Sequence, residues 1–178
     1  MTCIVGVQDG TDVFIGGDSA GVAGYNITVR SDQKVFRNGP FVMGFTSSFR
    51  MGQLLRYSFV PPKVPDTGLD KYMVVDFINA VRTCLKAGGW AKTDEGMERG
   101  GTFLVGVKGQ LFLIDGDYQV AKNADGYASV GCGEEYALGS LHTTTGQDPK
   151  TRVRLALQAA SHHSSGVTGP YTILKTKG

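Results

Sequence analysis

The sequence lacks the features that mark secreted, membrane and nucleic-acid-binding proteins. Its three cysteines, Cys3, Cys84 and Cys132, are an odd number without the spacing of a metal site or a disulfide framework, so we expect reduced thiols in a cytoplasmic protein. No apolar run approaches the ~18 residues of a membrane-spanning helix, and no secretory signal pattern opens the chain. Eighteen Lys and Arg residues against 16 acidic residues give a formal charge of +2, too small to indicate a nucleic-acid or membrane partner.

Glycine, in contrast, is abundant. It supplies 26 of the 178 residues, about double its usual share of roughly 7%. The glycines are scattered and form no repeat, so they predict many tight turns between short strands. A chain of this length is expected to fold as one domain over residues 1–178, with a substantial buried core.

The hydrophobic pattern alternates between strand-like and helix-like blocks. Short β-prone runs between turn signals predict strands at residues 2–7, 13–17, 25–30, 34–37, 41–45, 102–107, 110–114, 118–121, 127–130 and 171–175. Apolar residues at three- and four-residue steps predict helices at about 48–59, 70–88, 134–142 and 149–163. The polar segment 90–99 is interpreted as a surface loop. Strands, a helix pair, strands, a second helix pair and a last strand predict an α+β fold, a four-layer αββα sandwich of two stacked antiparallel sheets flanked by helix pairs.

Three polar residues fall at strand ends on one side of these expected sheets: Thr2, Asp18 and Lys34. Taken singly, each has an ordinary explanation, because a threonine can simply open a strand, an aspartate after two glycines is common in turns, and a lysine is usually solvated. Together they form a coherent catalytic device. Once Met1 is removed, the Thr2 α-amine can act as the base for its own hydroxyl, since its reference pKa of about 7.7–8.0 is close to neutral. A nearby lysine would lower the pKa of that amine, and an aspartate would hold the lysine in place.

With these residues in view, the sequence resembles the proteasome β-subunit family of N-terminal-nucleophile (Ntn) hydrolases, and most closely the bacterial HslV-type threonine peptidases. Thr2, the Gly16-Gly17-Asp18 bend and Lys34 match the spacing of the family's catalytic framework. The similarity continues through residues 43–48, 129–138 and 164–166, and so covers essentially the whole chain.

The resemblance implies a threonine-type endopeptidase that acts on peptides or unfolded proteins within a homo-oligomeric ring, with a separate AAA+ unfoldase as a further partner. It implies a backbone oxyanion donor near Ser47 and places Cys132 and Ser165 close to the nucleophile. It implies neither a cofactor nor a metal, and no nucleic-acid or membrane partner.

The sequence also departs from the family pattern. Cys132 stands where the family commonly has a serine, and His162 or His163 stands where the proteasome has an aspartate. These adjacent histidines are expected to point apart at a helix end, which does not favour a metal site. Two alternatives therefore stay open: a catalytically inactive proteasome-like protein that serves a structural or assembly role, and an amidase of the Ntn-hydrolase superfamily that acts on a small molecule.

Overall fold

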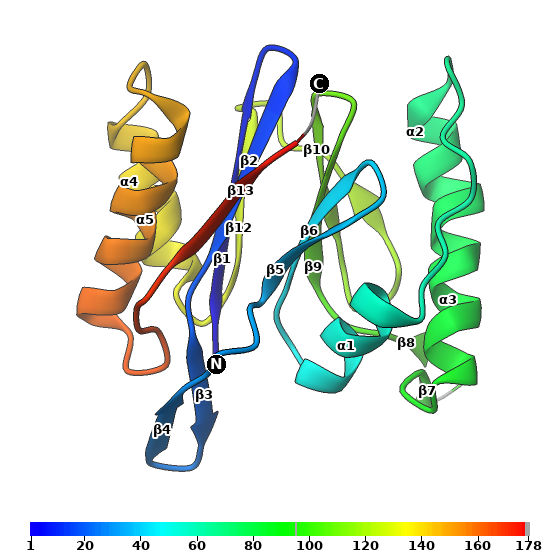
Figure 1. Cartoon of the computed structure of the whole chain (residues 1–178), viewed down its shortest axis with the longest axis horizontal. Coiled ribbons are helices and arrows are strands. Elements are labelled where there is room, and N and C mark those ends of the chain that lie inside the picture. Colours follow the sequence, from blue (N-terminus) through cyan, green and yellow to red (C-terminus); the bar gives the residue numbers. More distant parts are fainter. Residues whose placement is uncertain (95, 177–178) are drawn as a thin grey trace.

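The computed structural model describes residues 1–94 and 96–176, arranged in four layers (Figure 1). Two sheets lie face to face in the middle, and helices cover the outer face of each. Within the described ranges no helix has both the length and the apolar character needed to cross a membrane. The predicted α+β class and the four-layer sandwich are confirmed.

The first sheet positions the start of the chain. Among the described residues its strands follow the order β12 (Tyr127–Gly131), β1 (Cys3–Asp9), β2 (Asp12–Gly17) and β13 (Thr172–Lys175), and every neighbouring pair is antiparallel. The register sets Cys3 opposite Gly131 and Ile4 opposite Gly17. Residue 2 therefore lies between the end of β12 and the end of β2.

The second sheet carries the lysine side of the site. Its strands follow the order β11 (Val120–Ala121), β10 (Gln110–Ile114), β9 (Phe103–Val107), β6 (Phe41–Phe45) and β5 (Val35–Asn38). Every residue of β6 and β9 is buried, because one face packs on the first sheet and the other on helices.

Two helical layers cover the sheets. Helices α4 (Glu134–Thr143) and α5 (Pro149–His163) lie on the first sheet, whereas α1 (Phe49–Tyr57) and the segments α2 (Leu69–Tyr72), η1 (Met73–Phe77) and α3 (Ile78–Ala87) lie on the second. Ser48 caps α1, its Oγ accepting from the N–H of Arg50 at 3.0 Å. The predicted second helix is divided by η1, where one turn is a wider π-helix.

Three hydrophobic clusters fill the spaces between the layers, and β1 contributes to two of them. Cys3, Val5 and Val7 point toward α4 and α5, whereas Ile4 packs between the two sheets. A third cluster, rich in phenylalanine, joins the second sheet to α1 and α3. This alternation along β1 anchors the N-terminal strand on both faces.

Two segments differ from the sequence-based expectation. The alternating run at 25–30 was predicted as a half-buried strand, but β4 (Asn26–Val29) is exposed throughout and pairs with β3 (Ala20–Ala23) in a separate hairpin. The segment 90–99 was predicted as a loop, but β7 (Lys92–Asp94) and β8 (Met97–Arg99) form an antiparallel pair, with Glu95 outside the described residues. Alternation at 25–30 therefore identified a strand, and polarity at 90–99 identified an exposed segment. Neither pattern identified the strand with which each segment pairs.

Candidate active site

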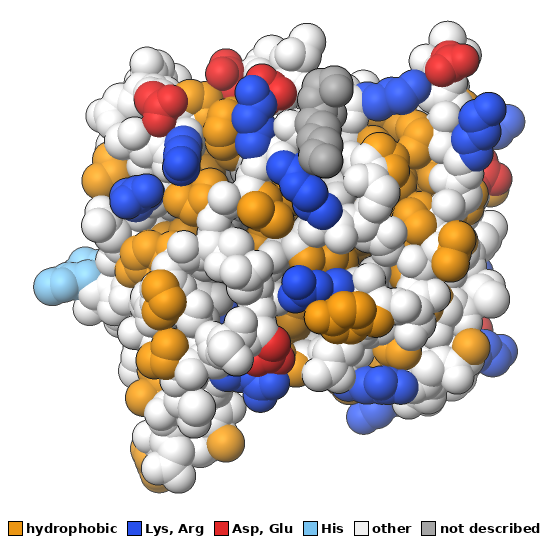
Figure 2. Space-filling view, in the orientation of Figure 1, with side chains coloured by type: hydrophobic (Ala, Val, Ile, Leu, Met, Phe, Trp, Pro, Cys, Tyr) orange, Lys and Arg blue, Asp and Glu red, His pale blue; other side chains and the backbone are white. Residues whose placement is uncertain are grey.

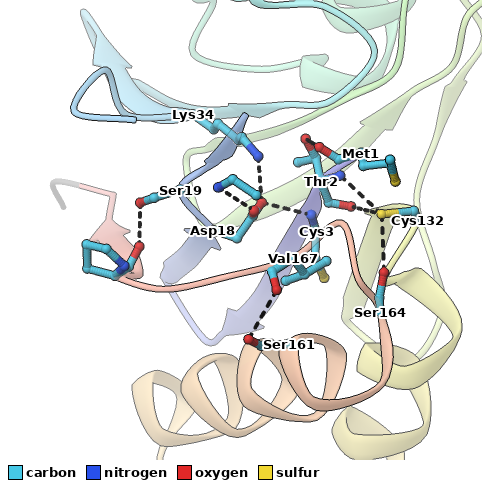
Figure 3. Close-up of polar contacts among 12 residues, drawn as sticks. Met1, Thr2, Cys3, Asp18, Ser19, Lys34, Cys132, Ser161, Ser164 and Val167 are labelled. Atoms are coloured by element: carbon cyan, nitrogen blue, oxygen red, sulfur yellow. Dashed lines mark hydrogen bonds and ion pairs between the residues drawn. The ribbon is translucent and has the colours of Figure 1, made fainter. Parts of the chain in front are cut away.

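Thr2 lies at the entrance of β1 and is 95% buried, with 5% of its surface exposed. Its backbone N–H donates to the Cys132 Sγ at 3.2 Å, and its hydroxyl donates to the Met1 carbonyl at 2.5 Å. Figure 3 shows these contacts at the junction of β1 and the loop that follows β12. While Met1 is attached, the Thr2 nitrogen is an amide and has no basic lone pair.

Asp18 and Lys34 form a fully buried ion pair beside this terminus. The Lys34 Nζ lies 2.8 Å from Asp18 Oδ1, and the two side chains are 1% and 0% exposed. The same Oδ1 accepts from the Cys3 N–H at 3.0 Å, so the lysine lies next to the first peptide unit that follows Thr2. The second carboxylate oxygen accepts from the Ala20 N–H at 2.8 Å.

This geometry gives Asp18 two roles. It fixes the backbone of β1, and it holds the Lys34 ammonium at the strand ends. Burial lowers the pKa of Lys34, and the charge of Asp18 opposes that shift.

Cys132 connects the terminus to the loop after α5. Its Sγ lies 3.2 Å from the Thr2 nitrogen, and the Ser164 hydroxyl donates to the same sulfur at 3.4 Å. Ser165, the predicted neighbour, is exposed in the turn, so the structure brings Ser164 to the site and not Ser165. The two serines are adjacent in the sequence, and the sequence alone did not indicate which of them contacts Cys132.

Gly131 makes this approach possible. It has φ +106°, and a Cβ atom added there would lie 2.2 Å from the Thr2 carbonyl oxygen. Only glycine fits such a backbone beside such a contact.

Replacing Gly131 with alanine is therefore expected to lower the free energy of unfolding by about 2–4 kcal/mol, through backbone strain and overpacking together. Gly10 provides a matched control, because it also has positive φ (+56°) but no atom within 4 Å of an added Cβ. Gly10→Ala should cost only about 1 kcal/mol. Urea unfolding of both variants measures the difference, and equal costs would contradict the close contact.

Ser47 occupies the turn between β6 and α1 at φ +64°, and its Oγ accepts from the Thr102 N–H at 3.0 Å. The neighbouring N–H groups are engaged, that of Thr46 by the Thr102 carbonyl at 3.1 Å and that of Ser48 by the Thr46 carbonyl at 2.7 Å. The hydrogen bonds of the described residues leave the Ser47 N–H free. The oxyanion donor near Ser47 stays a prediction, and this N–H has no competing acceptor among the described residues.

A cavity of about 140 Å³ lies directly beside Thr2. Sequence reasoning identified neither Val22 nor Phe49 as part of it. The Lys34 Nζ lies 5.7 Å from the centroid of the Phe49 ring, so the ion pair is close to one of the residues that line the cavity. The cavity is lined by Met1, Thr2, Val22, Phe45, Thr46, Ser47, Ser48 and Phe49.

The two histidines lie away from this cluster, exposed at the end of α5. The expectation that they point apart is wrong, because their rings are 4.7 Å apart in an edge-to-face arrangement, and His163 also stacks on Tyr136 at 5.2 Å. Within the described part of the chain, no group of three or more His, Cys, Asp or Glu side chains is arranged to hold a metal ion.

The sequence matches no family model and none of the curated proteins with which it was compared. Solved structures are similar over nearly the full chain. Thiobacillus denitrificans BPH in complex with epoxomicin has a TM-score of 0.80 at 17% identity and covers 98% of each chain, and BPH alone has a TM-score of 0.78 at 17% identity, covering 98% of this chain and 97% of its own. Eukaryotic HslV from Trypanosoma brucei has a TM-score of 0.68 at 20% identity and covers 97% of this chain and 98% of its own. The chain therefore has the fold of HslV-type, proteasome-like Ntn hydrolases.

Proposed function

We propose that the protein is an N-terminal threonine peptidase that becomes active when Met1 is removed. The observation that carries this proposal is the fully buried Lys34–Asp18 ion pair. The Asp18 oxygen that accepts from Lys34 also accepts from the backbone N–H of Cys3, the residue after Thr2. A buried ion pair is costly to desolvate, and such pairs are frequent where a pKa must be tuned. The likeness to HslV supports peptides or unfolded proteins as substrates, and also supports assembly into a ring fed by a separate AAA+ unfoldase.

In the proposed mechanism, the Thr2 Oγ attacks the scissile carbonyl carbon while the free Thr2 amine takes the hydroxyl proton. The Ser47 N–H stabilises the oxyanion. The protonated Thr2 amine gives its proton to the amine of the departing peptide fragment, which leaves an acyl ester on the Thr2 Oγ. A water molecule then hydrolyses this ester and regenerates Thr2. Lys34 keeps the amine neutral by like-charge repulsion, and Asp18 holds Lys34.

The direct test compares two chains that differ only by Met1. Ubiquitin fusions cleaved in vitro can release a chain that starts at Thr2 and a chain that starts at Met1, and intact mass verifies each product. Only the Thr2 chain is expected to hydrolyse fluorogenic peptides and to gain the mass of epoxomicin, the compound with which one similar structure was solved. Thr2→Val, released in the same way, keeps the side-chain shape without the hydroxyl and should be inactive.

Equal turnover by the Met1 and Thr2 chains would refute the mechanism. A Thr2 chain that neither turns over peptides nor is labelled would favour the assembly-protein alternative, for which the weak hydrogen-bonding capacity of Cys132 is the motivating observation. Hydrolysis of small amides but not of peptides would favour the amidase alternative.

A further inference from the structure

Two aromatic rings, those of Phe45 and Phe49, lie between the cavity beside Thr2 and a second cavity. Each cavity has a volume of about 140 Å³, and both are lined by these two residues. The rings meet edge to face with their centroids 5.8 Å apart, so they form a partition between the two spaces. The second cavity is otherwise lined by Asp32, Gln33, Gly52, Gln53, Arg56 and Tyr57.

Neighbouring groups hold the partition in place. The guanidinium carbon of Arg30 lies 3.9 Å from the centroid of the Phe49 ring, and two hydrogen bonds of 2.6 Å fix that guanidinium to Asp32. Phe45 is 6% exposed, and a Cβ atom added at Gly52 would lie 2.2 Å from its ring. One ring is therefore stacked on a fixed cation, and the other is packed closely against α1.

The charges near the partition are balanced. The two cations beside it, Arg30 and Lys34, are each held by a carboxylate, Asp32 at 2.6 Å and Asp18 at 2.8 Å. Figure 2 shows basic and acidic side chains next to each other on the surface between the start of the chain and α1. The side chains that line the cavity beside Thr2 carry no charge. A charged substrate side chain would lose its hydration there without gaining a partner, whereas an apolar side chain would not.

The volume of the cavity limits the size of the side chain that it can hold. A closed apolar cavity of roughly 150 Å³ accommodates a benzene molecule. The cavity beside Thr2, at about 140 Å³, therefore suits leucine, methionine or phenylalanine, but not the two fused rings of tryptophan. In a bound peptide, the side chain nearest to this cavity belongs to the residue whose carbonyl Thr2 attacks.

We propose that Phe49 sets the size limit of this residue, so that preferred substrates carry there an uncharged apolar side chain no larger than one ring. The inference rests on the proposed function, because the cavity affects cleavage only if Thr2 is the nucleophile. Phe49 acts in specificity and takes no part in the chemistry. Without its ring the two cavities would join, and the space beside Thr2 would roughly double.

Fluorogenic tripeptides that differ only in the residue before the fluorophore measure the preference of the chain that starts at Thr2. Leucine and phenylalanine are expected to give kcat/KM values about tenfold or more above those of naphthylalanine, aspartate and lysine. Phe49→Ala should raise kcat/KM for naphthylalanine relative to leucine by about tenfold or more, because the second ring can enter the joined cavity.

Two further variants control this comparison. Tyr57→Ala enlarges the second cavity without opening the partition, so it should keep the preference of the parent chain. Phe49→Val opens the partition less, and should shift the preference in the same direction as Phe49→Ala by a smaller factor. Thermal unfolding verifies that each variant is folded. The same preference in the parent and in both Phe49 variants would overturn the proposal, and so would a preference of the parent for a charged residue.

Affinity distinguishes a failure of this inference from a failure of the proposed function. The Thr2→Val chain lacks the hydroxyl, so calorimetry with the same tripeptides, ending in a carboxamide in place of the fluorophore, gives Kd values without turnover. Leucine should bind more tightly than naphthylalanine, and adding Phe49→Ala should reverse this order, whether or not the Thr2 chain hydrolyses peptides. Hydrolysis that is independent of this residue would leave the proposed function standing and refute the role of Phe49. Neither binding nor hydrolysis of any of these peptides would refute both.

Discussion

Replacing Lys34 with methionine is expected to reduce peptide hydrolysis by about 10²–10⁴-fold and to lower the free energy of unfolding by about 3–5 kcal/mol. Activity falls because no cation remains to keep the Thr2 amine neutral. Stability falls because the Asp18 carboxylate, 0% exposed, is left charged without its partner. Turnover by the chain that starts at Thr2 and urea unfolding measure the two effects.

A second substitution separates the two roles of the pair. Lys34→Met combined with Asp18→Asn removes both charges and keeps similar shapes, so most of the lost stability should return, short of about 1–3 kcal/mol for the backbone N–H that loses its acceptor. Activity should remain absent. Recovered activity in this neutral pair would contradict the role given to the ammonium.

Alkaline conditions are expected to destabilise the protein through Cys3. Burial raises the pKa of this thiol to about 12 from an ordinary value of 9.0. Between these values the folded thiol keeps its proton and the unfolded thiol loses it, so stability falls as pH rises. The loss is about 1.4 kcal/mol per pH unit above pH 9, or roughly 3 kcal/mol by pH 11.

The measurement is the slope of unfolding free energy against pH from 8 to 11. Cys3→Ala should remove the part of this slope that comes from the thiol. The substitution also lowers stability through lost packing, but by an amount that does not change with pH. Cys132→Ala is the matched control, because Cys132 is exposed whereas Cys3 is buried. Parallel slopes in the parent and Cys3→Ala chains would refute the assignment.

The order of strands and helices was enough to predict the four layers. Each segment had a clear periodicity of apolar residues, and strong turn residues separated one segment from the next. The hairpin of β3 and β4 was not predictable in the same way. Alternation at residues 25–30 identifies a strand, but a half-buried strand and a projecting hairpin have the same pattern. Their difference is set by the tertiary contacts available, which a single sequence does not contain.

The candidate site shows a similar division. Thr2, Asp18 and Lys34 were expected to converge because they end strands that the hairpin order brings together, and the structure does bring them together. Their catalytic roles stay a proposal. Ser164 was missed by one position, since a loop between a helix end and a strand gives no periodic signal for which serine turns inward.

The position of Met1 has a practical consequence for producing the protein. A Cβ added at Gly166 would lie 2.3 Å from the Met1 Cβ, so Gly166 packs closely against one side of Met1, which is otherwise 57% exposed. A purification tag fused in front of Met1 would keep the Thr2 nitrogen acylated. The last strand, β13, runs away from the N-terminus (Figure 1). After it, the Thr176 N–H donates to the Val13 carbonyl at 2.8 Å. Under the proposed mechanism, a chain that carries an amino-terminal handle is therefore expected to be inactive, and an affinity handle belongs at the carboxyl-terminal end of the chain.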